Sequence, residues 1–583
     1  MHRILIAMLL ASLALVAACS EEPQAESATP AATQAAPEVT QAEADNTGVL
    51  SEEARNELAA RAGAPLFDGM GSHHHAITTS DPDAQRYFDQ GLVIDFGFNH
   101  AESARSFRAA QTLDPECAMC FWGEALALGP NINVTSDGKV VMADDDRRDA
   151  YAAIQKAVAL KDTVTEPERD YIDALATRYN GDPSTPREPL DEAYANAMRD
   201  LYAKYPDDDD AASLFAESLM NTMPWDYWLD GTNPKPATQE VIAALETVLD
   251  RNPDHPMAIH LYIHAVEASD APERAEGPAD NLLDLVPGSG HLVHMPSHIY
   301  YRIGRYADAS KANVLAAAVD EAYIAACNAQ GFYPAAYYPH NIHFLWASSS
   351  MEGRSAVAIE AGEKVANNVR LEMIEEFPGV EFFKTIPVQS LVQFGRWDDV
   401  LALEAPPENL EYSRGIWHYA RATALARTGD VDGARAEQAL LAPLKDATDV
   451  HFLDTLLYPA TMLLDIADSL ALGEIAMAEG NFDAAIGSFE HAVSVQDELP
   501  YTEPPFWYYP TRHSLGKALL GAERPADAEA VYRADLAQYP RNGWAMFGLI
   551  QALEAQGKDA SDVQAQFDRV WAEADVTLTA SRF

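Results

Sequence analysis

Basic residues are scarce in this chain. Its 583 residues include 40 lysines and arginines against 90 aspartates and glutamates, which gives a formal net charge of −50 at pH 7. Binding to a nucleic-acid backbone is driven by cationic side chains, so we exclude nucleic acid as a partner. The acidic balance favours solubility and gives a weak preference for cationic or metal-ion partners.

Cysteine and the common catalytic motifs are also scarce. Cys19, Cys117, Cys120 and Cys327 are the four cysteines of the chain, too few for a disulfide scaffold. The sequence contains no GxGxxG, no GxSxG and no phosphate loop, so it shows no sign of dinucleotide binding, of a nucleophile elbow or of nucleotide hydrolysis. The catalytic residues of an enzyme therefore stay unknown from sequence.

The N-terminus predicts an export signal. Residues 4–18 follow Arg3 as an apolar run too short to cross a bilayer as a mature helix. The run ends in VAAC, which resembles the lipobox of bacterial lipoproteins. The resemblance implies a signal peptide over residues 1–18, acylation of Cys19 and a periplasmic location, and Ser20 in place of aspartate implies the outer membrane. A plain secretory signal is the alternative. Residues 19–50 have almost no large apolar side chains, so we expect a disordered tether.

A helical repeat fills most of the chain. Gly516, Tyr532 and Pro540 fall on the spacing of a tetratricopeptide repeat, in which a small residue lets two helices approach and a proline ends the second helix. Residues 472–492 and 91–115 follow the same pattern. The pattern predicts an all-α fold, a right-handed superhelical solenoid with loop insertions. We expect an N-terminal array over residues 51–350 and a C-terminal array over residues 351–583.

Histidines recur at the repeat spacing. His260 and His264 in HLYIH are each 34 residues before His294 and His298 in HLVHMPSH. Residues four apart share a helix face, and equivalent residues of adjacent repeats lie side by side. The spacing predicts a square of four imidazoles, which suits Zn, Cu or Fe. The further candidate ligands are His291, Glu267, His340 and His343, with Glu267 either a ligand or an acceptor behind the ligands. The alternative is that each histidine bonds to its own carbonyl or carboxylate.

Pro296 bears on this geometry. Inside a helix it removes one backbone hydrogen bond and bends the axis. Either the helix bends at Pro296, or it starts there and leaves His291 and His294 in a loop. The second alternative would break up the square.

A second distinctive stretch is ECAMCFWGEALALGPNIN at residues 116–133. Cys117 and Cys120 begin a helix, so a redox pair with lowered thiol pKa values is one interpretation. Two apolar thiols or a structural disulfide is the other. Asn131 and Asn133 place amide groups at a bend that would suit a ligand-facing edge.

This stretch, together with HMPSHIYYRIGRY, resembles the signatures of a bacterial group of tetratricopeptide-repeat proteins. The resemblance covers nearly the whole mature chain. The group has no settled activity, so the resemblance implies the fold and leaves the function open.

Two functions follow as hypotheses. The first is an interaction scaffold, held at the membrane by its N-terminal lipid alone, which binds a protein or peptide in the concave groove of the solenoid. The second is a metal-dependent enzyme, including a redox enzyme, that uses the histidines as ligands. Aromatic side chains would then wall its pocket, namely Trp225, Trp228, Phe506 and Trp507.

Overall fold

The computed structural model describes residues 50–134, 142–327, 329 and 332–583. The predicted signal peptide and Cys19 lie outside the described residues. Contacts divide the chain into a unit that ends at Ala54 and a unit over Arg55–Phe583, and the features below belong to the second. Among the described residues, no helix is both long enough and apolar enough to cross a membrane.

The described part is helical except for one hairpin of two short antiparallel strands, β1 (Trp228–Asp230) and β2 (Asn233–Pro234). Four short 3-10 helices lie between the described α-helices, namely η1 (Lys161–Thr163), η2 (Pro272–Ala275), η4 (Pro378–Thr385) and η5 (Ala442–Asp446), together with one π-helix, η3 (Tyr333–Tyr337). The all-α fold that the sequence predicts is confirmed.

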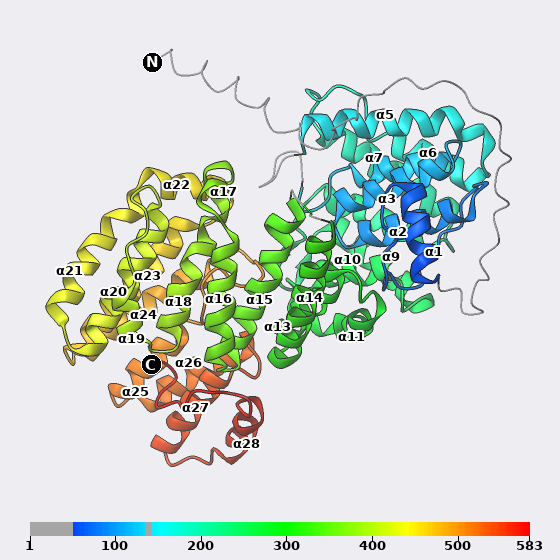
Figure 1. Ribbon diagram of the computed structural model, residues 1–583. Helices are drawn as coiled ribbons and strands as arrows, with labels where there is room; N and C mark the ends of the chain where they lie inside the picture. Colours follow the sequence, from blue (N-terminus) through cyan, green and yellow to red (C-terminus); the bar gives the residue numbers. More distant parts are fainter. Residues whose placement is uncertain (1–49, 135–141, 328, 330–331) are drawn as a thin grey trace. The chain divides into compact units, whose positions relative to one another are not determined.

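Consecutive helices pack as hairpins, for example α2 beside α3 and α20 beside α21 (Figure 1). The helices before the histidine-rich segment are α1 (Glu52–Ala62), α2 (Pro82–Phe96), α3 (His100–Leu113), α4 (Ala118–Ala127), α5 (Asp144–Leu160), α6 (Glu166–Ala176), α7 (Glu188–Lys204), α8 (Asp209–Asn221), α9 (Pro236–Arg251), α10 (Pro256–Val266) and α11 (Glu276–Leu285). The next are α12 (Gly290–His294), α13 (Pro296–Arg302), α14 (Tyr306–Cys327), α15 (Tyr338–Met351), α16 (Ser355–Asn368), α17 (Leu371–Glu376), α18 (Ile386–Gln393) and α19 (Trp397–Ala402). The last are α20 (Glu411–Thr428), α21 (Val431–Leu441), α22 (Thr448–Thr455), α23 (Ala460–Ala478), α24 (Phe482–Asp497), α25 (Arg512–Gly521), α26 (Pro525–Gln538), α27 (Gly543–Ala555) and α28 (Ser561–Val570).

Glycines set how closely these helices pack. A Cβ on Gly516 or on Gly548 would lie 2.3 or 2.2 Å from the ring of Tyr532, so that ring fills the space between two helices. Gly473 has the same relation to Phe489, at 2.2 Å. Because real side chains avoid such contacts, glycine is required at each position. This is the small-residue and aromatic packing of tetratricopeptide-type helix pairs, and it confirms the repeats read from the sequence.

Two hydrophobic cores follow each other along the chain. The first runs from Phe88 to Tyr337 and the second from Tyr301 to Leu578. The segment from α12 to α15 contributes side chains to both. The histidine-rich segment therefore lies at the junction of the two cores.

Candidate metal centre

Five imidazole rings form a closed circuit at this junction. Neighbouring ring centroids are between 4.8 and 5.6 Å apart, in the order His260, His264, His298, His294, His291 and back to His260. The sequence predicts a square of four of these rings. The structure brings all four together and inserts His291 between His260 and His294. We call these five residues and His340 the polyhistidine cluster.

His340 joins the circuit from a different helix. It projects from α15, and its ring centroid lies 4.8 Å from that of His294 and 5.6 Å from that of His298. His343, the other histidine of α15, lies outside the cluster, where its ring stacks on Trp346 at 5.3 Å.

Helix α10 carries His260 and His264, and α12 and α13 carry the next three histidines. The backbone stays helical across Met295 (φ −52°, ψ −38°), with Pro296 in the first turn of α13. His291 and His294 therefore lie in a helix and not in a loop, which excludes the second of the two alternatives. The cluster histidines of α10, α12 and α13 are all buried.

Each circuit histidine but His291 has one ring nitrogen held by a specific acceptor. The Nδ1–H of His260 donates to the carbonyl of Phe96 at 2.5 Å. That carbonyl belongs to the last residue of α2, where helical carbonyls lack partners of their own. The Nδ1–H of His294 donates to Asn313 Oδ1 at 2.6 Å, and the Asn313 amide nitrogen donates to Ala309, which fixes the orientation of the amide.

Glu267 holds the other two rings. The Nδ1–H groups of His264 and His298 donate to its two carboxylate oxygens, each at 2.7 Å. Glu267 is fully buried. Of the two roles that the sequence suggests for Glu267, this geometry is that of an acceptor behind the ligands, which fixes ring orientation and raises the basicity of the other nitrogen.

With Nδ1 protonated, the Nε2 atoms of these four histidines carry lone pairs. Within the described chain, Nε2 of His260 and of His264 are buried and have no hydrogen-bond partner, and neither has either ring nitrogen of His291. Nε2 of His294 and Nε2 of His298 face each other at 2.8 Å. Two lone pairs at that distance attract only if a proton or a cation lies between them. Buried polar atoms without partners cost a few kcal/mol each.

Burial keeps most of these rings neutral. It lowers the pKa of His260, His291, His294 and His340 well below 6.5, and neighbouring imidazoles lower it further. Burial acts against His298 too, but the charge of Glu267 outweighs it and raises the pKa of His298. Burial would raise the pKa of Glu267, but His298 and the hydrogen bond from His264 lower it to about 2. The neutral rings of His260, His291, His294 and His340 have the protonation state that a metal ligand set needs, and His298 would join the set by giving up one proton.

Three sets of ligand atoms in the polyhistidine cluster lie within 4.8 Å of one another. One set is His260, His264 and His291, and a second is His294, His298 and His340. The third set consists of His264, Glu267 and His298. In the third set both carboxylate oxygens of Glu267 already accept hydrogen bonds from the rings, so the two three-histidine sets are the ones that fit a metal best.

Aromatic side chains close the cluster on one side. The rings of Phe98 and Trp225 lie 4.4 Å from His260 and 5.0 Å from His264. Both residues have positive φ, 57° and 62°, a conformation that costs free energy in a bulky residue and is concentrated at functional sites. Asn133 ties this wall together, because its side chain donates to Tyr337 and accepts from Trp225 at 3.0 Å each.

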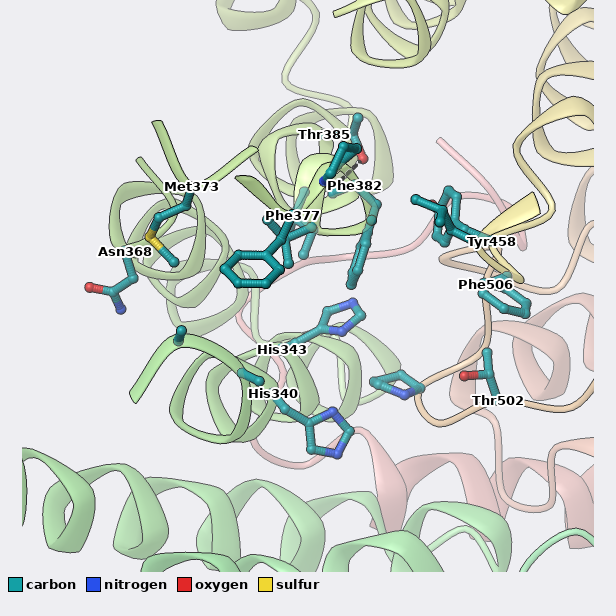
Figure 2. A pocket seen from close by; sticks show the side chains of 18 of the residues that line it. His340, His343, Asn368, Met373, Phe377, Phe382, Thr385, Tyr458, Thr502 and Phe506 are labelled. Carbon is teal, nitrogen blue, oxygen red and sulfur yellow. Dashed lines mark hydrogen bonds between the residues drawn. The ribbon is translucent and has the colours of Figure 1, made fainter. Parts of the chain in front are cut away.

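A cavity of about 940 Å³ lies on the other side of His340. Figure 2 shows His340 and His343 facing Phe377 and Phe382 across it, with Tyr458 and Phe506 at one end. We call this the aromatic cavity. Phe506 had been expected to wall a pocket and does so, whereas Trp507 is buried in the second core.

The cysteine stretch has a structural explanation. Cys117 and Cys120 form a disulfide, and both are buried at the start of α4. Asn131 accepts from the backbone amides of Asn133 and Val134 and donates to Nε2 of His100 at 2.6 Å. The side chain of Asn131 is thus occupied in holding its own bend.

A further set of possible ligand atoms, from His73, Asp210 and His255, lies within 4.8 Å. The ring of His255 caps α10: its Nδ1 accepts from the Ala258 amide at 3.2 Å. Its Nε2 must then carry the proton that it donates to Asp210 at 3.1 Å. A protonated nitrogen cannot bind a metal, so this set is a hydrogen-bond network around Asp210.

Sequence reasoning missed Phe96, Asn313 and Phe98 because none of them is linked to the histidines by the repeat spacing. The sequence held one sign of them: Phe98 is a bulky residue that follows Gly97 at the end of a helix.

No family model matches the chain, and no curated protein matches it. Solved structures similar to it include the human IFIT1 dimer with m7Gppp-AAAA, at 10% identity and a TM-score of 0.31, covering 91% of this chain and 96% of that chain. Yeast Tom70 is similar at 12% identity and a TM-score of 0.26, covering 84% and 91%. The P58(IPK) TPR domain is similar at 12% identity and a TM-score of 0.17, covering 58% and 89%. We draw no argument about function from likenesses at this level.

Proposed function

We propose that this protein is a lipid-anchored periplasmic metalloprotein, in which a tetratricopeptide-type solenoid holds transition-metal ions in the polyhistidine cluster. One observation carries the proposal: fixed Nδ1 donors leave a group of Nε2 lone pairs directed at one another in a buried space. Such an arrangement costs free energy unless a cation occupies it. All-imidazole sites suit copper, zinc and iron, and copper(II) binds most tightly of these divalent ions.

We propose two ions per chain, one in each three-histidine set. Structural sites have four protein ligands, whereas sites with three histidines keep a position open for water or substrate, as catalytic zinc sites do. The centre is therefore of the catalytic type, and a metal-dependent enzyme, including a redox enzyme, is the activity that it favours.

A membrane-tethered interaction scaffold is the second candidate. The helix-pair fold itself favours it, because solenoids offer extended binding surfaces, and Leu229 of the β-hairpin is 72% exposed. The groove would then bind a protein or peptide, and the polyhistidine cluster would be structural.

Metal analysis of the full chain, purified without a histidine tag or chelators, tests the first candidate. We expect about two ions per chain by mass spectrometry, falling to about one in His260→Gln and in His294→Gln, which keep most of the side-chain volume. His491, whose side chain is 56% exposed, gives the matched control His491→Gln, which should keep both ions.

A metal-free wild-type protein that also takes up no added copper or zinc would overturn the metal centre. Unchanged metal content in both cluster variants would overturn it as well. In either case the scaffold would be the remaining candidate.

The anchor is tested separately. Cells that express the full chain should incorporate radiolabelled palmitate into it, and Cys19→Ala should release the protein into the soluble periplasmic fraction. Soluble wild-type protein without label would contradict the anchor.

A further inference from the structure

The aromatic cavity reaches the proposed metal centre through one shared residue. His340 lines the cavity and also belongs to the three-histidine set with His294 and His298. It is partly exposed, whereas His294 and His298 are buried. A molecule in the cavity can therefore approach the proposed ion at His294, His298 and His340.

The size of the cavity limits what it takes. At about 940 Å³, it lies within the roughly 300–1,000 Å³ of small-molecule sites. A small organic molecule fits such a volume, and a folded partner does not.

The lining is a continuous set of aromatic faces. The ring of Phe382 lies 5.2 Å from that of Tyr458 and is parallel to it within 16°. Tyr458 in turn contacts Phe506 at 5.5 Å. Aromatic faces favour a planar ring that stacks against them.

The lining also selects for a ligand without charge. Burial lowers the pKa of His343 to about 3, so this ring adds no positive charge to the cavity at neutral pH. Among the described lining residues, Arg370 is exposed and lies at the edge. Apart from the proposed ion, an anionic ligand would find no buried cationic side chain among the described lining residues, and its desolvation would be costly.

One polar group in the lining calls for a hydrogen-bond donor. Glu503 lines the cavity, and its Oε2 is buried with no partner among the described residues. The other oxygen of Glu503 accepts from the Tyr501 hydroxyl. A ligand O–H group can pair with this oxygen, and an aromatic O–H is also a metal-binding oxygen.

We infer that the aromatic cavity is the substrate pocket of the metal centre, and that it takes an uncharged phenol or catechol. The ring of the ligand stacks on Phe382, and its oxygens lie between Glu503 and the ion at His294, His298 and His340. This inference rests on the proposed metal centre and adds the chemical class of its ligand.

A chromophoric catechol tests the inference. The full metal-loaded protein is titrated with 4-nitrocatechol at pH 5.5, where both hydroxyls of the probe stay protonated and the probe is uncharged. Binding is followed by the absorption spectrum and by calorimetry, and the metal content of each sample is measured in parallel. We expect saturable binding with a new absorption band from coordination to the metal. The matched probe 1,2-dimethoxy-4-nitrobenzene, which has no O–H group, should bind at least 10-fold more weakly.

Two variants locate the ligand. Phe382→Ala removes the stacking face and Glu503→Leu removes the acceptor. Each should weaken 4-nitrocatechol binding about 10-fold, since a stacked ring and a buried hydrogen bond each contribute on the order of 1–2 kcal/mol, and each should leave the metal content unchanged. Phe547→Ala, which removes a partly buried ring outside the cavity lining, is the control and should bind as the wild type does.

The outcomes separate the two proposals. Bound metal without 4-nitrocatechol binding, or with binding that neither variant weakens, overturns the substrate pocket and leaves the metal centre standing. Equal binding of the two probes overturns the phenol class. A protein that takes up no metal overturns the metal centre, and with it the coordinated ligand.

Discussion

At the scale of single residues, Glu267 is the side chain on which most of the polyhistidine cluster geometry depends. It orients two rings on different helices, because His264 lies on α10 and His298 on α13. Replacing it by glutamine keeps the size but leaves one acceptor for two N–H groups.

We therefore expect Glu267→Gln to lower metal affinity by about 10- to 100-fold, the usual cost of losing an acceptor behind a ligand. Competition with a chelator measures it. Glu437, which accepts from His418 at 2.7 Å elsewhere in the fold, provides the control Glu437→Gln, whose affinity should equal that of the wild type. Equal affinities in all three proteins would contradict the role assigned to Glu267.

The burial of Asp320 predicts that the free energy of unfolding depends on pH. This side chain is buried, and it accepts from Tyr333 at 2.8 Å and from Asn341 at 2.7 Å. Burial nevertheless raises its pKa to about 7. Because the folded state holds this proton more tightly than the unfolded state, the stabilising contribution is complete at low pH and is lost as pH rises from about 4 to about 7.

The variant Asp320→Asn does not titrate, so its stability relative to the wild type should increase with pH, by at most about 1.4 kcal/mol per pH unit. Urea unfolding at pH 5 and pH 7 measures the difference. Asp284→Asn, at an exposed position on α11, should show no such trend. A constant difference between the wild type and Asp320→Asn would refute the prediction.

At the scale of helices, we expect alanine substitutions at two glycines of one repeat to change the stability in opposite directions. Gly473 on α23 has the Phe489 ring 2.2 Å from where a Cβ would be, whereas Gly487 on α24 has nothing within 4 Å. Gly473→Ala should destabilise the protein by about 1–3 kcal/mol through overpacking. Gly487→Ala should stabilise it by roughly 0.5–1 kcal/mol, because alanine loses less entropy in a helix. Urea unfolding gives both values, and the same sign for both would contradict the packing described.

The repeat spacing also explains how much of the site was predictable. A period of 34 residues places His264 beside His298, since equivalent positions of stacked helix pairs are neighbours. It brings His260 and His294 into the same circuit, where the ring of His291 lies between them. It cannot place Phe96, Asn313 or Glu503, because Phe96 lies at the end of α2, Asn313 inside α14 and Glu503 in the loop after α24, and none of them occupies an equivalent repeat position. The cavity is likewise assembled from segments far apart in sequence, which no local pattern reveals.

At the scale of the whole molecule, a metal that binds the folded state alone must stabilise it. At a free-ion concentration of 100 times the Kd, the gain is about 2.7 kcal/mol per site. We expect copper or zinc to raise the melting temperature by a few degrees and a chelator to reverse the change. The double variant His294→Gln/His298→Gln should respond about half as much, and a full response from it would place the ions elsewhere.

Because the polyhistidine cluster lies at the junction of the two cores, it should affect how the protein resists a stretching force. Five of its rings come from α10, α12 and α13, which contribute side chains mainly to the first core, whereas His340 comes from α15, whose buried hydrophobic residues belong to the second core. Tension that parted the cores would have to draw His340 away from His294 and His298. When the chain is stretched from its ends, the two cores should separate at a higher force with an ion bound to these histidines. Without an ion, the junction should be the first part of the protein to open.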